Sequence, residues 1–174
     1  MQPQIVELDA RALEHRLTAL VQILADSVAL GAAIGFMDSL THDEAARFWR
    51  ESVRPEIVAG RRILFAAQHR GDMLGTVQLI TGMPLNQPHR CEIAKMIVHP
   101  RARRLGLGRA LMTRAIDRAR ERGKTLITLD TRTGDVAEPP YASVGFEVAG
   151  VIPKYAWDPD DNAKHATTYI YRRI

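Results

Sequence analysis

Residues 92–122, EIAKMIVHPRARRLGLGRALMTRAIDRARER, constrain the fold more than any other part of the sequence. The first residues, as far as Val98, are apolar and partly β-branched, which favours a strand, and Pro100 ends this run because it lacks an N–H donor. A basic segment with two glycines follows. Beyond it, apolar residues recur every three or four positions, which places them on one face of a helix. The stretch therefore predicts a strand, a basic loop and a long amphipathic helix.

A loop of this kind, leading into a helix, is suited to binding a phosphate. The first N–H groups of a helix have no partner within the helix, the helix dipole is positive there, and glycine lets a ligand approach the backbone closely. The spacing here is Arg103-x-x-Gly106-x-Gly108, followed directly by Arg109. No Gly-Lys-Ser/Thr follows, which excludes a Walker loop, and Leu111 stands where the dinucleotide fingerprint needs a third glycine. A basic turn with two loop glycines is the alternative for these residues taken alone.

The composition bounds the class of protein. The chain has 174 residues, of which 46% are hydrophobic and 25% charged, so we expect residues 1–174 to form one globular domain. A net charge of +4 suggests an anionic ligand, without separating a nucleotide from nucleic acid. A single cysteine, Cys91, excludes an internal disulfide and a cysteine metal cluster, and we expect no metal site. No apolar run could span a membrane and the N-terminus does not resemble a signal peptide, so we expect a cytoplasmic protein without membrane contact.

Taken in order, the sequence predicts an α/β domain with a mixed sheet of about seven mostly antiparallel strands, a central parallel pair and four helices. The predicted strands are residues 5–8, 63–67, 73–80, 89–98, 125–131, 147–152 and 167–171, and the helices are residues 9–28, 41–60, 107–122 and 137–144. The strands on either side of the third helix should be parallel neighbours, because a helix of this length makes a crossover. Their carboxyl ends then meet where α/β sheets usually bind ligands. Pro55 should kink or end the second helix, because its ring clashes with the carbonyl of Glu51.

The basic loop and a second motif together resemble the Gcn5-related N-acetyltransferase (GNAT) family. The loop is similar to the family's pyrophosphate signature, Arg/Gln-x-x-Gly-x-Gly/Ala after a strand. Further along, Tyr141-x-x-x-Gly145-Phe146 is similar to the other recurrent signature, and the order of the two motifs is the family's. The resemblance covers residues 63–174. It implies the GNAT fold and an enzyme that uses acetyl-CoA as co-substrate and passes the acetyl group directly to an acceptor.

The resemblance also implies a role for each part of the site. Backbone N–H groups and guanidinium charges would hold the pyrophosphate, and strand backbone would align the acetyl carbonyl. These cofactor-binding residues are Arg103, Arg104, Leu105, Gly106, Leu107, Gly108 and Arg109 in the loop, and Met96, Ile97 and Val98 in the strand. Tyr141 would be the general acid on the departing thiolate. Glu92 and Asp130 are the candidate general bases, although Glu92 could instead be a solvated strand residue and Asp130 could bind backbone at the strand end.

Two positions depart from the family pattern. Gly134 stands where the family often has an asparagine that holds the pantetheine arm, so Asp135 or backbone must substitute, or the contact is lost. Pro139 and Pro140 replace the usual leucine before the tyrosine. Proline is tolerated in the first turn of a helix, so this short helix should begin near Ala137.

The acceptor is the least constrained part of the function. Residues 35–37 (GFM), 129–131 (LDT) and 136–138 (VAE) are similar to the tabtoxin-resistance subgroup, which acetylates a small amino-acid toxin. We therefore expect a small-molecule amine or hydroxyl, such as an amino-acid-like toxin or antibiotic. The alternatives are a protein or peptide acceptor and a non-catalytic acetyl-CoA sensor. We expect the acceptor pocket in residues 31–40 and 82–89, and either a monomer or a homodimer. A nucleic-acid partner is not expected, since aromatic residues are not interleaved with the basic ones.

Overall fold

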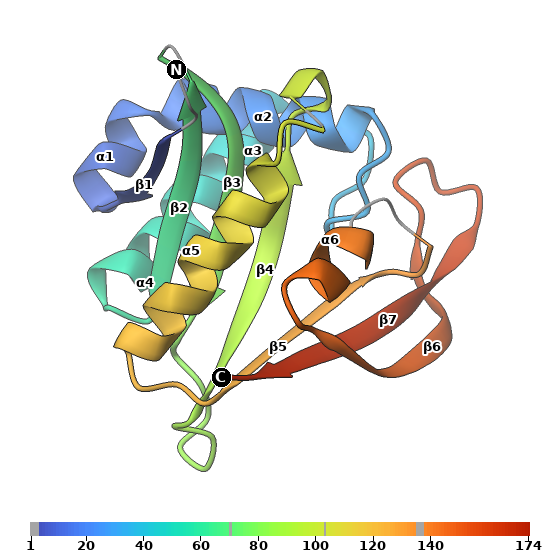
Figure 1. Cartoon of the computed structure of the whole chain (residues 1–174). Coiled ribbons are helices and arrows are strands. Elements are labelled where there is room, and N and C mark those ends of the chain that lie inside the picture. Colours follow the sequence, from blue (N-terminus) through green and yellow to red (C-terminus); the bar gives the residue numbers. More distant parts are fainter. Residues whose placement is uncertain (1–3, 70, 103, 135–137) are drawn as a thin grey trace.

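A seven-stranded sheet forms the centre of the computed structural model, which describes residues 4–69, 71–102, 104–134 and 138–174 (Figure 1). The strands lie in the order β1-β2-β3-β4-β5-β7-β6. Their bounds are β1 Gln4–Leu8, β2 Arg62–His69, β3 Asp72–Ile80, β4 Arg90–Val98, β5 Leu126–Arg132, β6 Glu147–Trp157 and β7 Lys164–Arg173. Strands β4 and β5 are parallel and the other neighbouring pairs are antiparallel, which confirms the predicted fold class.

The helices follow the predicted segments with local differences. They are α1 Ala10–His15, α2 Leu17–Ala29, α3 His42–Arg47, α4 Arg54–Val58, α5 Leu107–Glu121 and α6 Glu138–Ser143. The first predicted helix is interrupted at Arg16, which separates α1 from α2. Asp9 caps α1 by accepting a hydrogen bond from the Ala12 N–H at 2.7 Å. Thr41 opens α3 with a capping box, in which its hydroxyl accepts from the Glu44 N–H.

The second predicted helix does not end at Pro55, but its geometry changes just before that residue. A π-helical turn, Phe48–Val53, joins α3 to α4, and Pro55 lies in the first turn of α4. A π-helical turn uses i→i+5 hydrogen bonds and is wider than an α-helical one, which accommodates a residue that lacks an N–H and carries a ring. Within this turn, the fully buried Trp49 donates its indole N–H to the Leu20 carbonyl at 3.1 Å, which ties the turn to α2.

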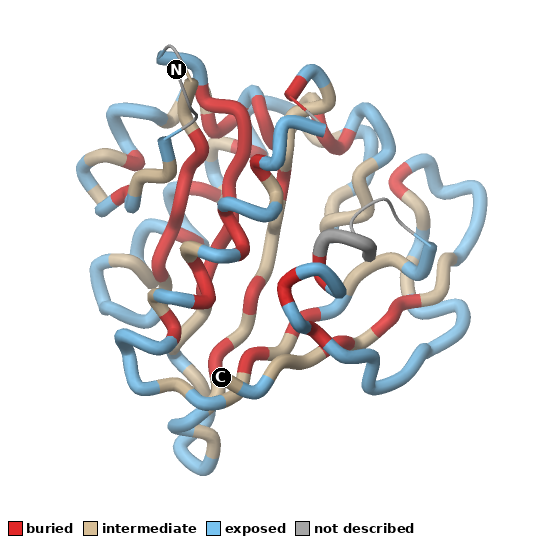
Figure 2. Tube along the Cα trace, in the orientation of Figure 1, coloured by how far each residue is buried: buried red, intermediate tan, exposed pale blue. Residues whose placement is uncertain are grey.

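Two hydrophobic cores lie on the two faces of the sheet. Helices α5 and α6 cover one face and α1–α4 cover the other (Figure 1). Strands β2 and β3 are consequently buried on both sides, whereas β6 at the sheet edge is exposed along nearly its whole length (Figure 2). None of the helices in the described part of the chain is long and apolar enough to cross a membrane.

The parallel pair β4–β5 separates soon after it begins. The two strands pair only from Arg90 opposite Leu126 to Glu92 opposite Thr128. Further along, β4 contains a bulge against β3, since Gln78 pairs with Ala94 but Thr76 pairs with Ile97, which leaves two β4 residues opposite one on β3. We call the opening between the diverging strands, beyond Glu92, the splay.

Candidate active site

The N-terminus of α5 has the properties of an anion site. Its N-cap, Gly106, adopts the left-handed conformation with φ 75° and ψ 4°, and no side chain caps the helix. The N–H groups of residues 107–109 have no hydrogen-bond partner within the described ranges, and the first turn contains no acidic residue. The positive end of the helix dipole and bare amide groups therefore point at the same place, which favours a phosphate.

The residues around this helix end divide into anchors and exposed groups. Leu107 is 2% exposed and fixes the start of α5 in the core, whereas Leu105 is 62% exposed. Arg104, also left-handed at φ 64°, and Arg109 are exposed and supply positive charge. Arg103, predicted for the same role, lies outside the described residues. The structure thus places the predicted loop residues that it describes around one helix end.

The carboxyl half of β4 borders the splay next to this loop. Ile97 pairs with Thr76 and Val98 with Gly75 on the β3 side, while the opposite edge of β4 has no strand partner beyond Glu92 in the described structure. Met96 and Val98 are partly buried against the α5 core, and Ile97 belongs to the core on the other face. Backbone groups on an open strand edge need partners, so an extended ligand that enters the splay can hydrogen-bond there.

Tyr141 lies on α6, on the same side of the sheet as α5. It is 6% exposed, and its ring centroid is 6.2 Å from that of Phe146 in an edge-to-face arrangement. Cys91 belongs to the same core, and burial raises the pKa of its thiol to about 11. A thiol with that pKa is protonated at neutral pH and is a poor nucleophile. The site therefore has a phenol on this side of the sheet but no activated cysteine.

Glu92 and Asp130 lie on the opposite side of the sheet. Side chains alternate along a strand, and the neighbours of Glu92 on β4 point into the α5 core. Glu92 is opposite Thr128 on β5, and Asp130 follows two residues later, on the same face. The guanidinium of Arg90 donates to Thr128 Oγ1 at 2.7 Å and lies 3.5 Å from a Glu92 oxygen. The structure thus brings the two carboxylates to one face and separates them from Tyr141 by the sheet.

Two tyrosines that the sequence analysis did not identify lie on the same face as the two carboxylates. Tyr169 on β7 is opposite Asp130, and its hydroxyl lies 2.7 Å from that of Tyr155 on β6. The hydrogen bond with Tyr155, with partial burial and the nearby Asp130 charge, raises the pKa of Tyr169 to about 12, so the phenol stays protonated and can donate or accept. The alternation of residues 167–171 places Tyr169 on one strand face, but its pairing with Tyr155 follows from the register of two strands.

Lys95, at the β4 bulge, is a third residue that the sequence analysis did not identify. Its φ is 49°, and its ammonium donates to the Ile34 carbonyl at 2.5 Å and lies 5.5 Å from the centre of the Phe36 ring. The signal in the sequence was a lysine within an otherwise apolar strand, IAKMIV. That signal gives neither the bulge nor the contact with the loop after α2.

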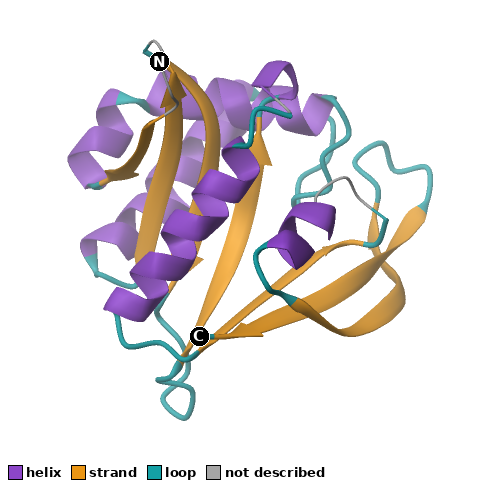
Figure 3. Cartoon of the chain, viewed as in Figure 1, coloured by secondary structure: helices purple, strands orange, loops and turns teal. Residues whose placement is uncertain are grey.

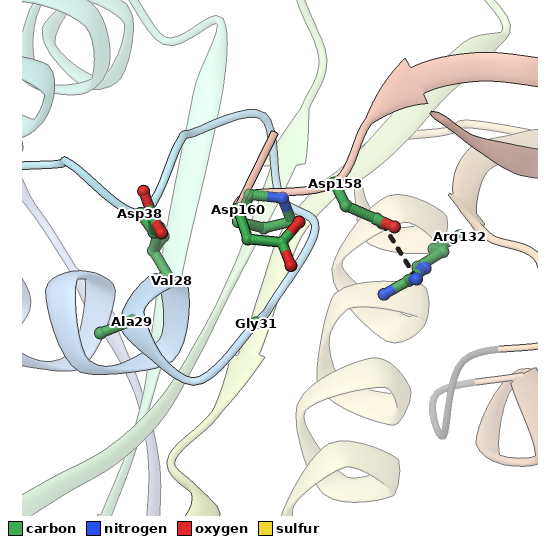
Figure 4. A pocket seen from close by; sticks show the side chains of 8 residues that line it. Val28, Ala29, Gly31, Asp38, Arg132, Asp158 and Asp160 are labelled. Carbon is green, nitrogen blue, oxygen red and sulfur yellow. Dashed lines mark ion pairs between the residues drawn. The ribbon is translucent and has the colours of Figure 1, made fainter. Parts of the chain in front are cut away.

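A pocket of about 270 Å³ lies between the end of α2 and the β6–β7 turn (Figure 4). Its lining consists of Val28, Ala29, Gly31, Asp38, Arg132, Asp158, Pro159 and Asp160. The Asp38 N–H donates to the Pro159 carbonyl at 2.9 Å, and Arg132 forms an ion pair with Asp158 at 2.9 Å. Of residues 31–40, Gly31 and Asp38 line this pocket. Residues 82–89 do not line it, since they form the loop at the other end of β4 (Figures 1 and 3).

Two predicted features fall at or beyond the limits of the described chain. Gly134 is left-handed at φ 77°, in the turn after β5, and Asp135, its proposed substitute as a pantetheine ligand, lies outside the described residues. In the described ranges, no group of three or more His, Cys, Asp or Glu side chains could hold a metal ion.

Comparisons with known proteins agree with this geometry. The model of the Acetyltransferase (GNAT) family matches residues 17–146. A curated protein of Azospirillum brasilense, an uncharacterized N-acetyltransferase in the hisH-hisA intergenic region, is 28% identical over 136 residues, which cover 76% of this chain and 79% of the relative.

Several solved structures share the fold. One is a structure of yncA, a putative acetyltransferase from Salmonella typhimurium with its cofactor acetyl-CoA, and it matches with a TM-score of 0.79. Another is a structure of a phosphinothricin acetyltransferase from Sinorhizobium meliloti in complex with AcCoA, and it matches with a TM-score of 0.78. The Salmonella structure is 19% identical in sequence, and the match covers 99% of this chain and 94% of that one. The Sinorhizobium structure is 17% identical, and the match covers 100% of this chain and 89% of that one. A ribosomal-protein-alanine N-acetyltransferase from Brucella melitensis matches with a TM-score of 0.80 at 21% identity, covering 98% of this chain and 99% of its own.

Proposed function

This chain belongs to the GNAT family of acetyltransferases, which use acetyl-CoA as co-substrate, and we propose that its acceptor is an amine or hydroxyl of a small molecule. An amino-acid-like toxin or antibiotic is the acceptor class that we favour, because three short stretches are similar to the tabtoxin-resistance subgroup. The single cysteine, Cys91, is a free thiol, which suits the cytoplasmic location that we also propose.

The observation that carries the proposal is the placement of candidate acid and base on opposite sides of the splay. Tyr141 lies on the α5 side, and Glu92 and Asp130 lie on the other. An acetyl group held between β4 and β5 would then have a proton donor on one side and a proton acceptor on the other. Direct transfer from thioester to acceptor needs two separate proton transfers, one away from the attacking atom and one to the departing sulfur, and two different side chains can serve them.

The donor substrate fits the bare helix end and the open strand edge. Residues 104–109 would hold its diphosphate through backbone N–H groups and arginine charge, and the backbone of residues 96–98 would orient the acetyl carbonyl. Acetyl-CoA supplies an acetyl group activated as a thioester. Loss of one oriented oxyanion donor typically costs about 2.7–4 kcal/mol of transition-state stabilisation, so the position of this strand matters for rate.

The chain's own proton transfers follow from the two faces. Tyr141 would donate its phenolic proton to the departing sulfur. Glu92 or Asp130 would take the proton from an acceptor ammonium or hydroxyl, directly or through one water. The buried, protonated Cys91 supports a mechanism without an acyl-enzyme.

A thiol-release assay tests the proposal. Acetyl-CoA is offered with small amines, amino-acid antibiotics and peptides, and free CoA is measured. With the best acceptor, Tyr141→Phe should reduce kcat by about 10²–10⁴-fold, the usual contribution of a general acid. Tyr171→Phe is the matched control, since Tyr171 on β7 hydrogen-bonds Glu147 at 3.1 Å and has no proposed role.

The carboxylates are tested with the same assay. Glu92→Gln and Asp130→Asn keep side-chain size but cannot accept a proton, so the variant that removes the base should lose activity near neutral pH. Wild-type turnover by Tyr141→Phe, or by both carboxylate variants, would contradict the assigned roles. CoA release with peptides alone would identify a peptide acceptor, and acetyl-CoA binding without CoA release would identify a sensor.

A further inference from the structure

Lys95 has a backbone conformation and a position that set it apart from the rest of β4. Its φ of 49° is unfavourable for a residue with a side chain, and it lies in the bulge where β4 leaves its regular register with β3. The ammonium reaches across to the loop after α2, where it donates to the Ile34 carbonyl. Strained residues often occur at ligand sites, which makes the surroundings of this ammonium informative.

The charge of Lys95 is only partly compensated in the described structure. The Ile34 carbonyl is its one hydrogen-bond acceptor there, and no carboxylate forms an ion pair with it. Asp130 and Glu92 are near enough to favour the charged form, yet burial outweighs them and lowers the pKa of Lys95. An ammonium has three donors, so two remain for other partners. A half-buried cation without a contacting counter-ion is unfavourable, and a bound anion would remove that cost.

The loop after α2 is shaped to this ammonium. Gly35 has φ 85°, and a Cβ built there would lie 3.0 Å from Lys95 Nζ. The Phe36 ring lies 5.5 Å from the same atom and covers another side of it. The backbone at Gly35 can approach so closely because it has no side chain. The ammonium is therefore held in place rather than free to move through solvent.

We propose that Lys95 binds a carboxylate of the acceptor, so that the acceptor is a small molecule carrying both an amine and an acidic group. This inference rests on the proposed function. Lys95 lies on β4 between Glu92, a candidate base, and residues 96–98, which would orient the acetyl group. An acceptor whose carboxylate contacts Lys95 would have its amine beside Glu92 and Asp130, which favour an ammonium before transfer. The two charges of a zwitterion thus match the two signs of charge on this face.

A merely structural role for Lys95, holding the loop to the strand, predicts a different result. Lys95→Gln keeps an N–H donor for the Ile34 carbonyl but removes the charge, and Lys95→Arg keeps the charge. Lys124→Gln is the matched control, since Lys124 also donates to a loop carbonyl, that of Pro88 at 2.8 Å, at the other end of β4. CoA binding, measured by calorimetry, verifies that each variant has folded.

The test compares free amino acids with their carboxamides, for instance phenylalanine with phenylalaninamide, as acceptors in the thiol-release assay. Wild type should favour the acids by about tenfold or more in kcat/KM, and Lys95→Gln should abolish that preference by raising KM for the acids alone. Lys95→Arg and Lys124→Gln should retain the preference. Comparing the acid-to-amide ratio of each variant with that of wild type removes the difference in amine pKa between acid and amide.

Several outcomes would overturn the inference. Equal losses with acids and amides in Lys95→Gln would show a structural role only. A wild-type enzyme that uses amides as well as acids, or only amines without an acidic group, would exclude carboxylate recognition while leaving the proposed function intact. An absence of CoA release with every amine and hydroxyl compound would instead overturn the proposed function, and this inference with it.

Discussion

One added methyl group should have opposite effects on stability at Gly106 and at Gly108. Gly106 is left-handed at φ 75°, and a Cβ there would meet nothing within 4 Å. The free-energy cost of a substitution at Gly106 therefore comes from the backbone conformation alone. For alanine that cost is about 1–2 kcal/mol. Gly108 is within α5, and its Cβ would make an ordinary contact, 3.8 Å from Val98 Cγ2. Gly108→Ala should therefore stabilise the protein by about 0.4–1 kcal/mol, because alanine restricts the unfolded chain.

These free energies correspond to measurable shifts in Tm. In a chain of this length, 1 kcal/mol changes Tm by about 2–4 °C. Gly106→Ala should thus lower Tm by about 2–8 °C and Gly108→Ala should raise it by about 1–4 °C, measured by calorimetry without ligand. Gly106→Asn is the control, since asparagine tolerates the left-handed conformation and can cap a helix, and should fall closer to wild type.

Binding of CoA should separate the same two variants. Gly106→Ala displaces the N–H groups of residues 107–109, and one lost hydrogen bond to a charged group is worth about 1.5–3 kcal/mol, or roughly a tenfold to hundredfold weaker Kd. Gly108→Ala leaves these groups in place and should bind nearly as well as wild type. Stability shifts of the same sign in both variants, or wild-type affinity in Gly106→Ala, would refute the reasoning.

Gly75→Ala should lower the free energy of unfolding by about 1–3 kcal/mol, because its Cβ would lie 2.8 Å from the Ile97 carbonyl oxygen, and backbone cannot withdraw cheaply. Urea denaturation measures this, with Gly150→Ala, which meets nothing within 4 Å, as the neutral control; equal stability of the two would contradict it. Cys91, whose pKa burial raises from 9.0 to about 11, should react with iodoacetamide at pH 8 only after unfolding. Because the folded state holds the thiol proton more tightly than the unfolded state does, this thiol's contribution to the free energy of unfolding is complete below pH 9 and declines as the pH rises to about 11. Rapid labelling of the native protein at pH 8 would contradict the prediction.

The segments that the sequence predicted well are those with local signals. Residues 92–122 predicted a strand, a glycine loop and a helix, and the structure has β4, that loop and α5. The parallel pairing of β4 with β5 also followed, because a helical crossover of this length brings the flanking strands together. Helix caps at Asp9 and Thr41 likewise depend on neighbouring residues alone.

Features that depend on contacts between distant segments could not be predicted. The second helix passes Pro55 because a π-helical turn precedes it, and that turn is packed against α2 through Trp49. The pairing of Tyr155 with Tyr169 needs the β6–β7 register, which shifts between Ile152 and Ala156. Such shifts result from packing and leave no periodic signal in the chain.

The sequence by itself determined the order of the elements and the family of the chain, because turn residues, caps and apolar periodicity act over a few neighbouring positions. Only the tertiary structure decided where β4 and β5 separate, that Glu92 and Asp130 face away from Tyr141, and that Lys95 reaches the loop after α2. Those facts depend on strand register and on a bulge. Both are set by the balance of packing across the whole sheet, which no short stretch of sequence contains.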